Sequence, residues 1–152
     1  MVRGLYALFA ALAFLLPASS TAGVTSHDAA VLREMNRVRA VHGLPALRYD
    51  GHLQRAAVSH TREMLANNVF EHGAFDSRLA RFDIKSRVTG ENLAWGTGSR
   101  GTARSIVAAW LASPEHRANL LRSSFSRVGV SDLLGRFQGH TGAHVVTADF
   151  AG

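Results

Sequence analysis

The chain has 152 residues, no cysteine and a formal net charge of +6. This length predicts one domain, and the missing thiols exclude a cysteine nucleophile and a cysteine metal ligand, so that any metal site must use histidine, aspartate or glutamate. The basic residues are scattered and form no dense patch interleaved with aromatic residues, and we therefore expect no nucleic-acid partner.

Residues 1–22 have the pattern of a secretory signal peptide. Arg3 provides a basic start, residues 5–16 are an uninterrupted apolar run, and small residues follow at a suitable cleavage site. The alternative is an uncleaved membrane anchor, for which an apolar run of roughly 12 residues is short against the ~20 needed to span a bilayer. We expect a secreted or periplasmic monomer, residues 23–152, that contacts the membrane only through its signal peptide.

Apolar residues at helical spacing predict helices in the first half of this domain. The first is expected over residues 27–42 with Ser26 as its N-cap. The second begins after Asp50, which caps it, and ends at Asn68. A short third helix is predicted over residues 77–82.

The stretch GENLAWGTG, residues 90–98, contains three glycines in nine positions, which argues against a long regular element there. A helix that opens at Thr102 or Gly101 and is broken at Ser113-Pro114 follows, and Ser113 is expected to cap a short helix that runs to Leu121.

The C-terminal part predicts an antiparallel hairpin. Residues 128–134 and 144–150 are typical of strands, and the glycine-rich segment 135–142 is typical of the turn between them. Helices first and a strand pair last, with at most one or two more strands near residues 87–94, predict an α+β fold with a small antiparallel sheet.

Four histidines are the candidates for chemistry: His60, His72, His116 and His144. His72 lies in a loop between two phenylalanines, and His116 lies near the start of a short helix. No pair of these histidines has a local metal-ligand spacing such as H-x-x-x-H, so spacing alone is weak evidence for a site that also includes Glu91.

Several ordered motifs resemble the CAP superfamily, also called SCP, which includes class 1 plant pathogenesis-related proteins and venom allergens. The motifs are F-x-H at residues 70–72, G-E-N at 90–92, W-x-x-S-P-x-H-R-x-N at 110–119 and R-V-G-V at 127–130. The resemblance is strongest to the short, cysteine-free bacterial branch and covers the chain from about His27. It implies an α-β-α sandwich with a cleft lined by histidines and acids, in which some members bind a divalent metal.

Carried over to this chain, the resemblance implies a cleft set of His72, Glu91 and His116. The animal and plant branch has a second glutamate where this chain has Ser113, and a second histidine where it has Val145. His144 is one place away, and a one-residue step turns a strand side chain to the opposite face. Whether His144, His60 or Glu115 joins the cleft is left open.

Two roles are open for Glu91. As a ligand or catalytic group, it would complete a site in which two imidazoles, one carboxylate and a water suit a divalent metal such as zinc. As a structural residue, it would accept hydrogen bonds and hold its loop in shape. Asn92, Trp95 and Trp110 are expected to serve structure and packing.

We expect a binding module rather than an enzyme, whose ligand is a divalent metal, a lipid, a peptide or a cell-envelope component. The alternative function is a metal-assisted hydrolase acting on peptides or cell-envelope polymers, with Glu91 as third ligand or as base. A third hypothesis makes the polar cluster purely structural and places function on the surface. No G-x-S-x-G motif is present, which argues against a serine hydrolase.

Overall fold

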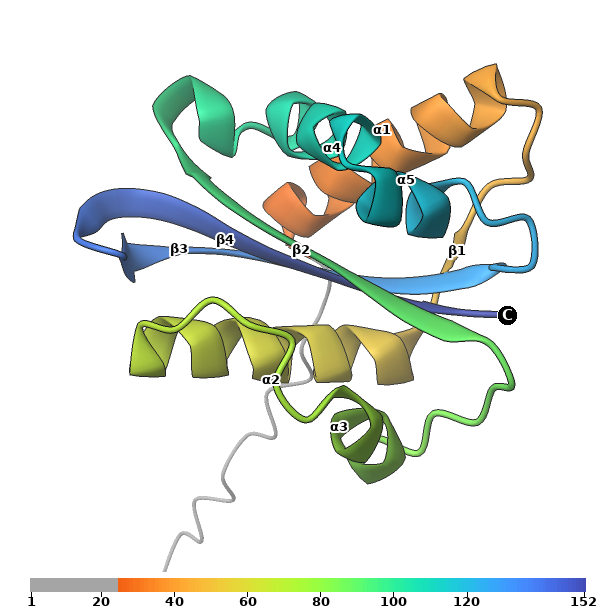
Figure 1. Ribbon diagram of the computed structural model, residues 1–152, viewed down its shortest axis with the longest axis horizontal. Coiled ribbons are helices and arrows are strands. Elements are labelled where there is room, and N and C mark those ends of the chain that lie inside the picture. The colour runs from red at the N-terminus through yellow and green to blue at the C-terminus, as the bar shows by residue number, and fades with distance from the viewer. Residues whose placement is uncertain (1–24) are drawn as a thin grey trace, which may run out of the picture.

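Two layers of helices cover opposite faces of a four-stranded sheet in the computed structural model, which describes residues 25–152 (Figure 1). One layer contains α1 (Ser26–Val41), α4 (Ala103–Ala112) and α5 (Pro114–Leu120), and the other contains α2 (Gly51–Asn67) and α3 (Phe75–Arg81). The predicted α-β-α sandwich is confirmed. The predicted signal peptide lies outside the described residues, and no helix within them is long and apolar enough to cross a membrane.

The sheet is built around the C-terminal hairpin. Its strands are β1 (Arg48–Tyr49), β2 (Thr89–Thr97), β3 (Arg127–Phe137) and β4 (His140–Ala151), in the order β1-β3-β4-β2. Strand β4 pairs antiparallel with both β3 and β2, and the pairing with β3 is the predicted hairpin. The two-residue strand β1 was not expected, and it pairs parallel to β3.

Local capping signals explain where the helices begin. Thr25, and not the predicted Ser26, is the N-cap of α1: its hydroxyl accepts from the N–H of Asp28, and the Asp28 carboxylate accepts from the N–H of Thr25. Asp50 caps α2 as predicted, because its carboxylate accepts from the first backbone N–H groups of that helix. Asn68 ends α2 in the left-handed conformation, with φ of 54°.

A strand was expected near residues 87–94, but the regular element in the glycine-rich stretch is longer than predicted. Most of the stretch belongs to β2, and the short 3-10 helix η1 (Gly98–Gly101) follows. A Cβ atom at Gly90 would lie 2.9 Å from the Phe125 ring, and one at Gly96 would lie 2.6 Å from the Arg100 carbonyl oxygen. These two glycines therefore permit close packing within the strand rather than interrupting it.

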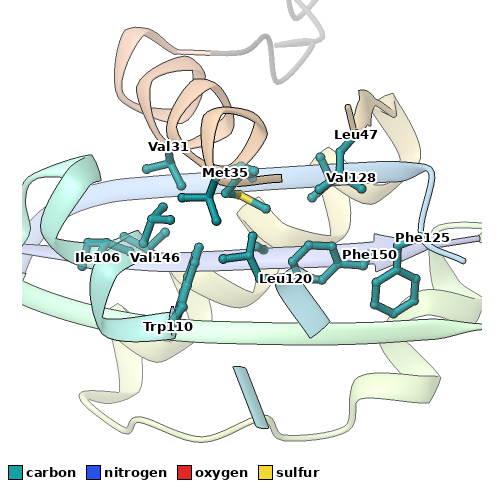
Figure 2. Packing of buried hydrophobic residues seen from close by; sticks show 14 residues of the cluster. Val31, Met35, Leu47, Ile106, Trp110, Leu120, Phe125, Val128, Val146 and Phe150 are labelled. Atoms are coloured by element: carbon teal, nitrogen blue, oxygen red, sulfur yellow. The ribbon is translucent and has the colours of Figure 1, made fainter. Parts of the chain in front are cut away.

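The larger core lies between the sheet and the layer of α1, α4 and α5 (Figure 2). Trp110 is almost completely buried there, as predicted, and its Nε1–H donates to the carbonyl oxygen of Leu93 at 2.9 Å. The rings of Phe125 and Phe150 stack with centroids 5.2 Å apart. Because β2 and β4 are anchored by this packing, the polar residues on their opposite face are held in fixed positions.

Candidate functional site

Glu91 is the centre of a buried polar cluster on the sheet face that packs against α2 and α3. Its Oε1 atom lies 2.7 Å from Nδ1 of His72, and its Oε2 atom is bonded to the guanidinium of Arg78. Arg78 comes from α3 and also donates to the carbonyl oxygen of His72 at 3.3 Å. Both side chains of the Glu91–Arg78 pair are almost completely buried, so each is the main counter-charge of the other.

His72 presents one ring edge to Glu91 and the rest to solvent, with 58% of its side chain exposed. A carboxylate can only accept hydrogen bonds, and we therefore assign the ring proton to Nδ1. The lone pair is then on Nε2, which is the atom that a metal or a ligand donor would contact. This carboxylate–histidine arrangement is the one that orients metal-binding histidines in proteins.

His116 is held in a comparable way from α5. Its Nδ1 atom lies 3.0 Å from the hydroxyl oxygen of Ser113. Burial lowers the pKa of His116, the nearby charge of His72 lowers it further, and Glu115 raises it. The lowered pKa favours the neutral imidazole, which is the form that binds metals.

His60 and Asp149 are the buried titratable neighbours of Glu91. Nε2 of His60 is 2.9 Å from the carbonyl oxygen of Glu71 and 3.9 Å from Oε2 of Glu91, and burial lowers the pKa of this histidine. Asp149 is the direct partner of Glu91 across β2 and β4 and is completely buried. Neither of its carboxyl oxygens has a hydrogen-bond partner among the described residues. Burial, together with the charge of Glu91, raises the pKa of Asp149 well above its ordinary value.

Asn92 and Asn119 tie α5 to β2, which supports the structural role expected for Asn92. The Asn92 amide donates to the carbonyl oxygen of His116 at 2.9 Å. The Asn119 amide donates to the carbonyl oxygen of Glu91 and to the Asn92 side chain, both at 3.1 Å. These bonds position the helix that carries His116 relative to the strand that carries Glu91.

A hollow of about 250 Å³ opens beside the cluster, between α2 and α3. Its lining residues are Glu63, Ala74, Ser77, Arg78 and Arg81. The guanidinium that neutralises Glu91 therefore also borders space that a small ligand can enter.

The structure brings His72 and Glu91 into direct contact, and Asn92 joins the backbone of His116 to the strand that carries Glu91. The predicted ligand set of these three residues remains a prediction, since both Glu91 oxygens are already bonded to other side chains. His144 lies on the opposite face of the sheet, because it is five residues before Asp149 in β4. It belongs instead to a group with His27 and Asp132 whose ligand atoms all lie within 4.8 Å of one another.

Sequence reasoning missed Arg78 and Asp149. Arg78 is one of many scattered arginines, and nothing local distinguishes it from a solvated helix residue. Asp149 offered one signal: a carboxylate within the apolar strand sequence HVVTADF must either face solvent or be buried at a cost. Strand alternation places it on the same face as Val145 and Thr147, and pairing with β2 places it beside Glu91.

The comparisons with known proteins agree with this architecture. The sequence profile of the cysteine-rich secretory protein family, known as CAP, matches residues 32–150. The chain belongs to the CAP family. Among relatives, YkwD of Bacillus subtilis is 30% identical over 117 residues, which are 74% of this chain and 44% of YkwD. The chain thus spans less than half the length of this curated relative.

Solved structures share the fold. An outer surface protein of Borrelia burgdorferi has a TM-score of 0.67 at 22% identity, covering 79% of this chain and 87% of that one. An extracellular SCP-domain protein of Bacillus anthracis has a TM-score of 0.63 at 28% identity, covering 80% of this chain and 38% of that one. Manganese-bound Ac-ASP-7 has a TM-score of 0.58 at 15% identity, covering 88% of this chain and 73% of that one.

Proposed function

We propose that this CAP protein is an extracytoplasmic binding module, in which His72 and His116 present their free ring nitrogens to a divalent metal, with zinc as the first candidate. The observation that carries the proposal is the 2.7 Å contact between Nδ1 of His72 and Glu91. This contact holds the ring proton on Nδ1 and leaves a lone pair on Nε2 of the half-exposed ring. The Ser113 hydroxyl can orient the His116 ring in the same way.

The donor set fits a borderline metal ion better than a hard one. Two imidazoles suit zinc, nickel or copper, whereas calcium and magnesium prefer oxygen ligands. In this proposal Glu91 orients His72 from behind and is not itself a ligand, because Arg78 occupies its other oxygen. The bound manganese of Ac-ASP-7 is consistent with a metal in this fold but does not identify the ligands here. A bound metal would leave coordination positions for a peptide or another small ligand.

The metal-assisted hydrolase is the weaker candidate for a chemical reason. A hydrolase needs a base that can take a proton from water, and the Glu91 carboxylate is already engaged by a histidine and an arginine. Glu71 and Glu115, the other acids near the cluster in sequence, are exposed. We therefore favour binding without turnover.

Secretion or periplasmic export is part of the proposal. It is supported by the signal-peptide pattern of residues 1–22 and by the extracellular and outer-surface proteins among the structural neighbours. Mass spectrometry of the exported protein tests it: a mass corresponding to a chain that starts at Gly23 is expected, and a full-length chain retained in the cytoplasm would contradict export.

Calorimetric titration with zinc near neutral pH tests the ligand site. All described elements lie within residues 25–152, so a chain starting at Gly23, without a histidine tag, retains them. We expect a binding event that is lost in both His72→Ala and His116→Ala and is retained in His140→Ala, an exposed histidine of β4. Zinc binding that both cleft variants retain would overturn the metal proposal.

A further inference from the structure

A second group of metal-ligand side chains lies in the other layer of the sandwich, on the sheet face opposite to Glu91. His27 comes from the first turn of α1, Asp132 from β3 and His144 from β4, and one ligand atom of each lies within 4.8 Å of the others. These residues border a hollow of about 240 Å³, which Gly98 and Gly101 also line. Three ligand-bearing elements thus meet where an ion can enter.

The central imidazole of this group is held in one orientation. Nδ1 of His144 lies 2.8 Å from Oδ1 of Asp132, and the His27 and His144 ring centroids are 5.3 Å apart. On the other side, a Cβ atom at Gly101 would lie only 2.6 Å from Cδ2 of His144, so that the absence of a side chain there makes room for the ring. A ring fixed in this way loses little freedom when it binds an ion.

The charge around the group favours a cation. Asp28 and Asp132 are both buried, and Oδ1 of Asp28 accepts from the backbone N–H of Asp132 at 2.8 Å. Across residues 25–152, the ion pairs formed by arginine and lysine involve other carboxylates: Glu34, Asp50, Asp83 and Glu91. Asp28 accepts further hydrogen bonds from Thr25 and Gln54, and Asp132 is paired with His144, but neither buried carboxylate has an arginine or lysine partner among these ion pairs. A buried charge without a permanent counter-charge is unfavourable.

We propose that His27, Asp132 and His144 form a separate binding site for a divalent transition metal of the zinc type. Two imidazoles and one carboxylate are a ligand set used for zinc and for other first-row metals, with the remaining positions left to water or to a ligand. The ion would supply the positive charge that Asp28 and Asp132 lack and would connect the start of α1 to β3 and β4. This site shares no residue with the His72 site and does not rest on the proposed function.

Zinc titration of single variants tests the proposal separately from the first site. His27 is exposed, so His27→Ala is expected to leave the fold intact, as circular dichroism can verify. We expect one zinc equivalent to be lost, or bound at least about tenfold more weakly, in His27→Ala and in His144→Ala. The same equivalent is expected to remain in His72→Ala, in His116→Ala and in the control His140→Ala.

Gly101→Ala provides a second variant that removes no ligand. The added methyl group displaces the His144 ring, so weaker zinc binding by this folded variant would support the site, as would the absence of calcium and magnesium binding. Unchanged stoichiometry and affinity in both His27→Ala and His144→Ala would overturn the proposal, and so would a wild-type chain that binds no zinc. If only the His72 and His116 variants lose an equivalent, the proposed function survives and this second site does not.

Discussion

Nδ1 of His72 and Oε1 of Glu91 lie 2.7 Å apart, although one residue is in a loop and the other is in β2. The other oxygen of Glu91 is bonded to Arg78, which lies in α3. Glu91 thus joins a loop and a helix to the sheet and at the same time orients the exposed histidine. Of the two roles that the sequence left open for Glu91, these bonds support the structural one, and the role as a ligand or catalytic group stays a prediction.

Glu91→Gln is expected to destabilise the protein strongly. The amide keeps the shape of the side chain but leaves the buried Arg78 guanidinium without its counter-charge, and breaking a buried pair in this way lowers the free energy of unfolding by about 3–5 kcal/mol. Urea denaturation near neutral pH measures the change. The control is Glu34→Gln, which breaks a pair with a mostly exposed Arg37 and should cost less than about 1 kcal/mol. An equally small loss in Glu91→Gln would mean that Asp149 takes over as the counter-charge.

Asp149→Asn is expected to change the pH dependence of stability. Burial raises the pKa of Asp149, so above about pH 4 the unfolded chain releases this proton while the folded protein retains it. Folding then becomes less favourable as the pH rises towards the folded pKa. Asparagine does not titrate, so the free energy of unfolding of the variant should gain on that of the wild type as the pH rises from about 4 towards neutral. Urea denaturation at several pH values measures this difference.

Asp50→Asn is the matched control, because its expected sign is opposite. Burial alone would raise the pKa of Asp50, but hydrogen bonds from the Leu53 N–H and from Arg127 outweigh it and lower the pKa. This carboxylate stabilises the fold above its unfolded pKa, and the contribution is lost as the pH falls through the folded pKa. The variant should therefore lose stability at neutral pH and approach the wild type in acid. Parallel pH profiles for the two variants would refute the assignment for Asp149.

Gly129→Ala is expected to disrupt the packing of α2 on the sheet. A Cβ atom at Gly129 would lie 2.1 Å from the carbonyl carbon of Leu53 and 2.2 Å from the backbone nitrogen of Gln54, so the helix backbone itself must move. A loss of about 3 kcal/mol or more follows from overpacking that side-chain adjustment cannot relieve, and thermal unfolding measures it. Gly51→Ala is the control, since its nearest contacts are at 3.9 Å and ordinary. Equal melting temperatures for both variants would show that the α2 backbone does not pack closely against Gly129 of β3.

Much of the secondary structure was predictable from local signals. Asp50 and Thr102 cap their helices with their own side chains, and Asn68 ends one by adopting a left-handed backbone, so that a few adjacent residues carry the information. The motifs of the CAP family added His72, Glu91 and His116. A strand near residues 87–94 is confirmed, but the prediction of no long regular element over residues 90–98 is wrong, because Gly90 and Gly96 accommodate close neighbours rather than mark a loop.

By itself, the sequence determined the helices, the hairpin, the family and the residue types available for chemistry, because capping, periodicity and motif order are local properties of the chain. Only the tertiary structure decided which of these residues meet. Arg78 reaches Glu91 because α3 lies in the same helical layer as α2, on the sheet face that carries Glu91 (Figure 1), and Asp149 faces Glu91 because of the register between β2 and β4. The same strand turns His144 to the opposite face, where it meets His27 and Asp132 from other parts of the chain. Such contacts depend on strand register and layer packing, which follow from the sum of many weak interactions rather than from any short stretch of sequence.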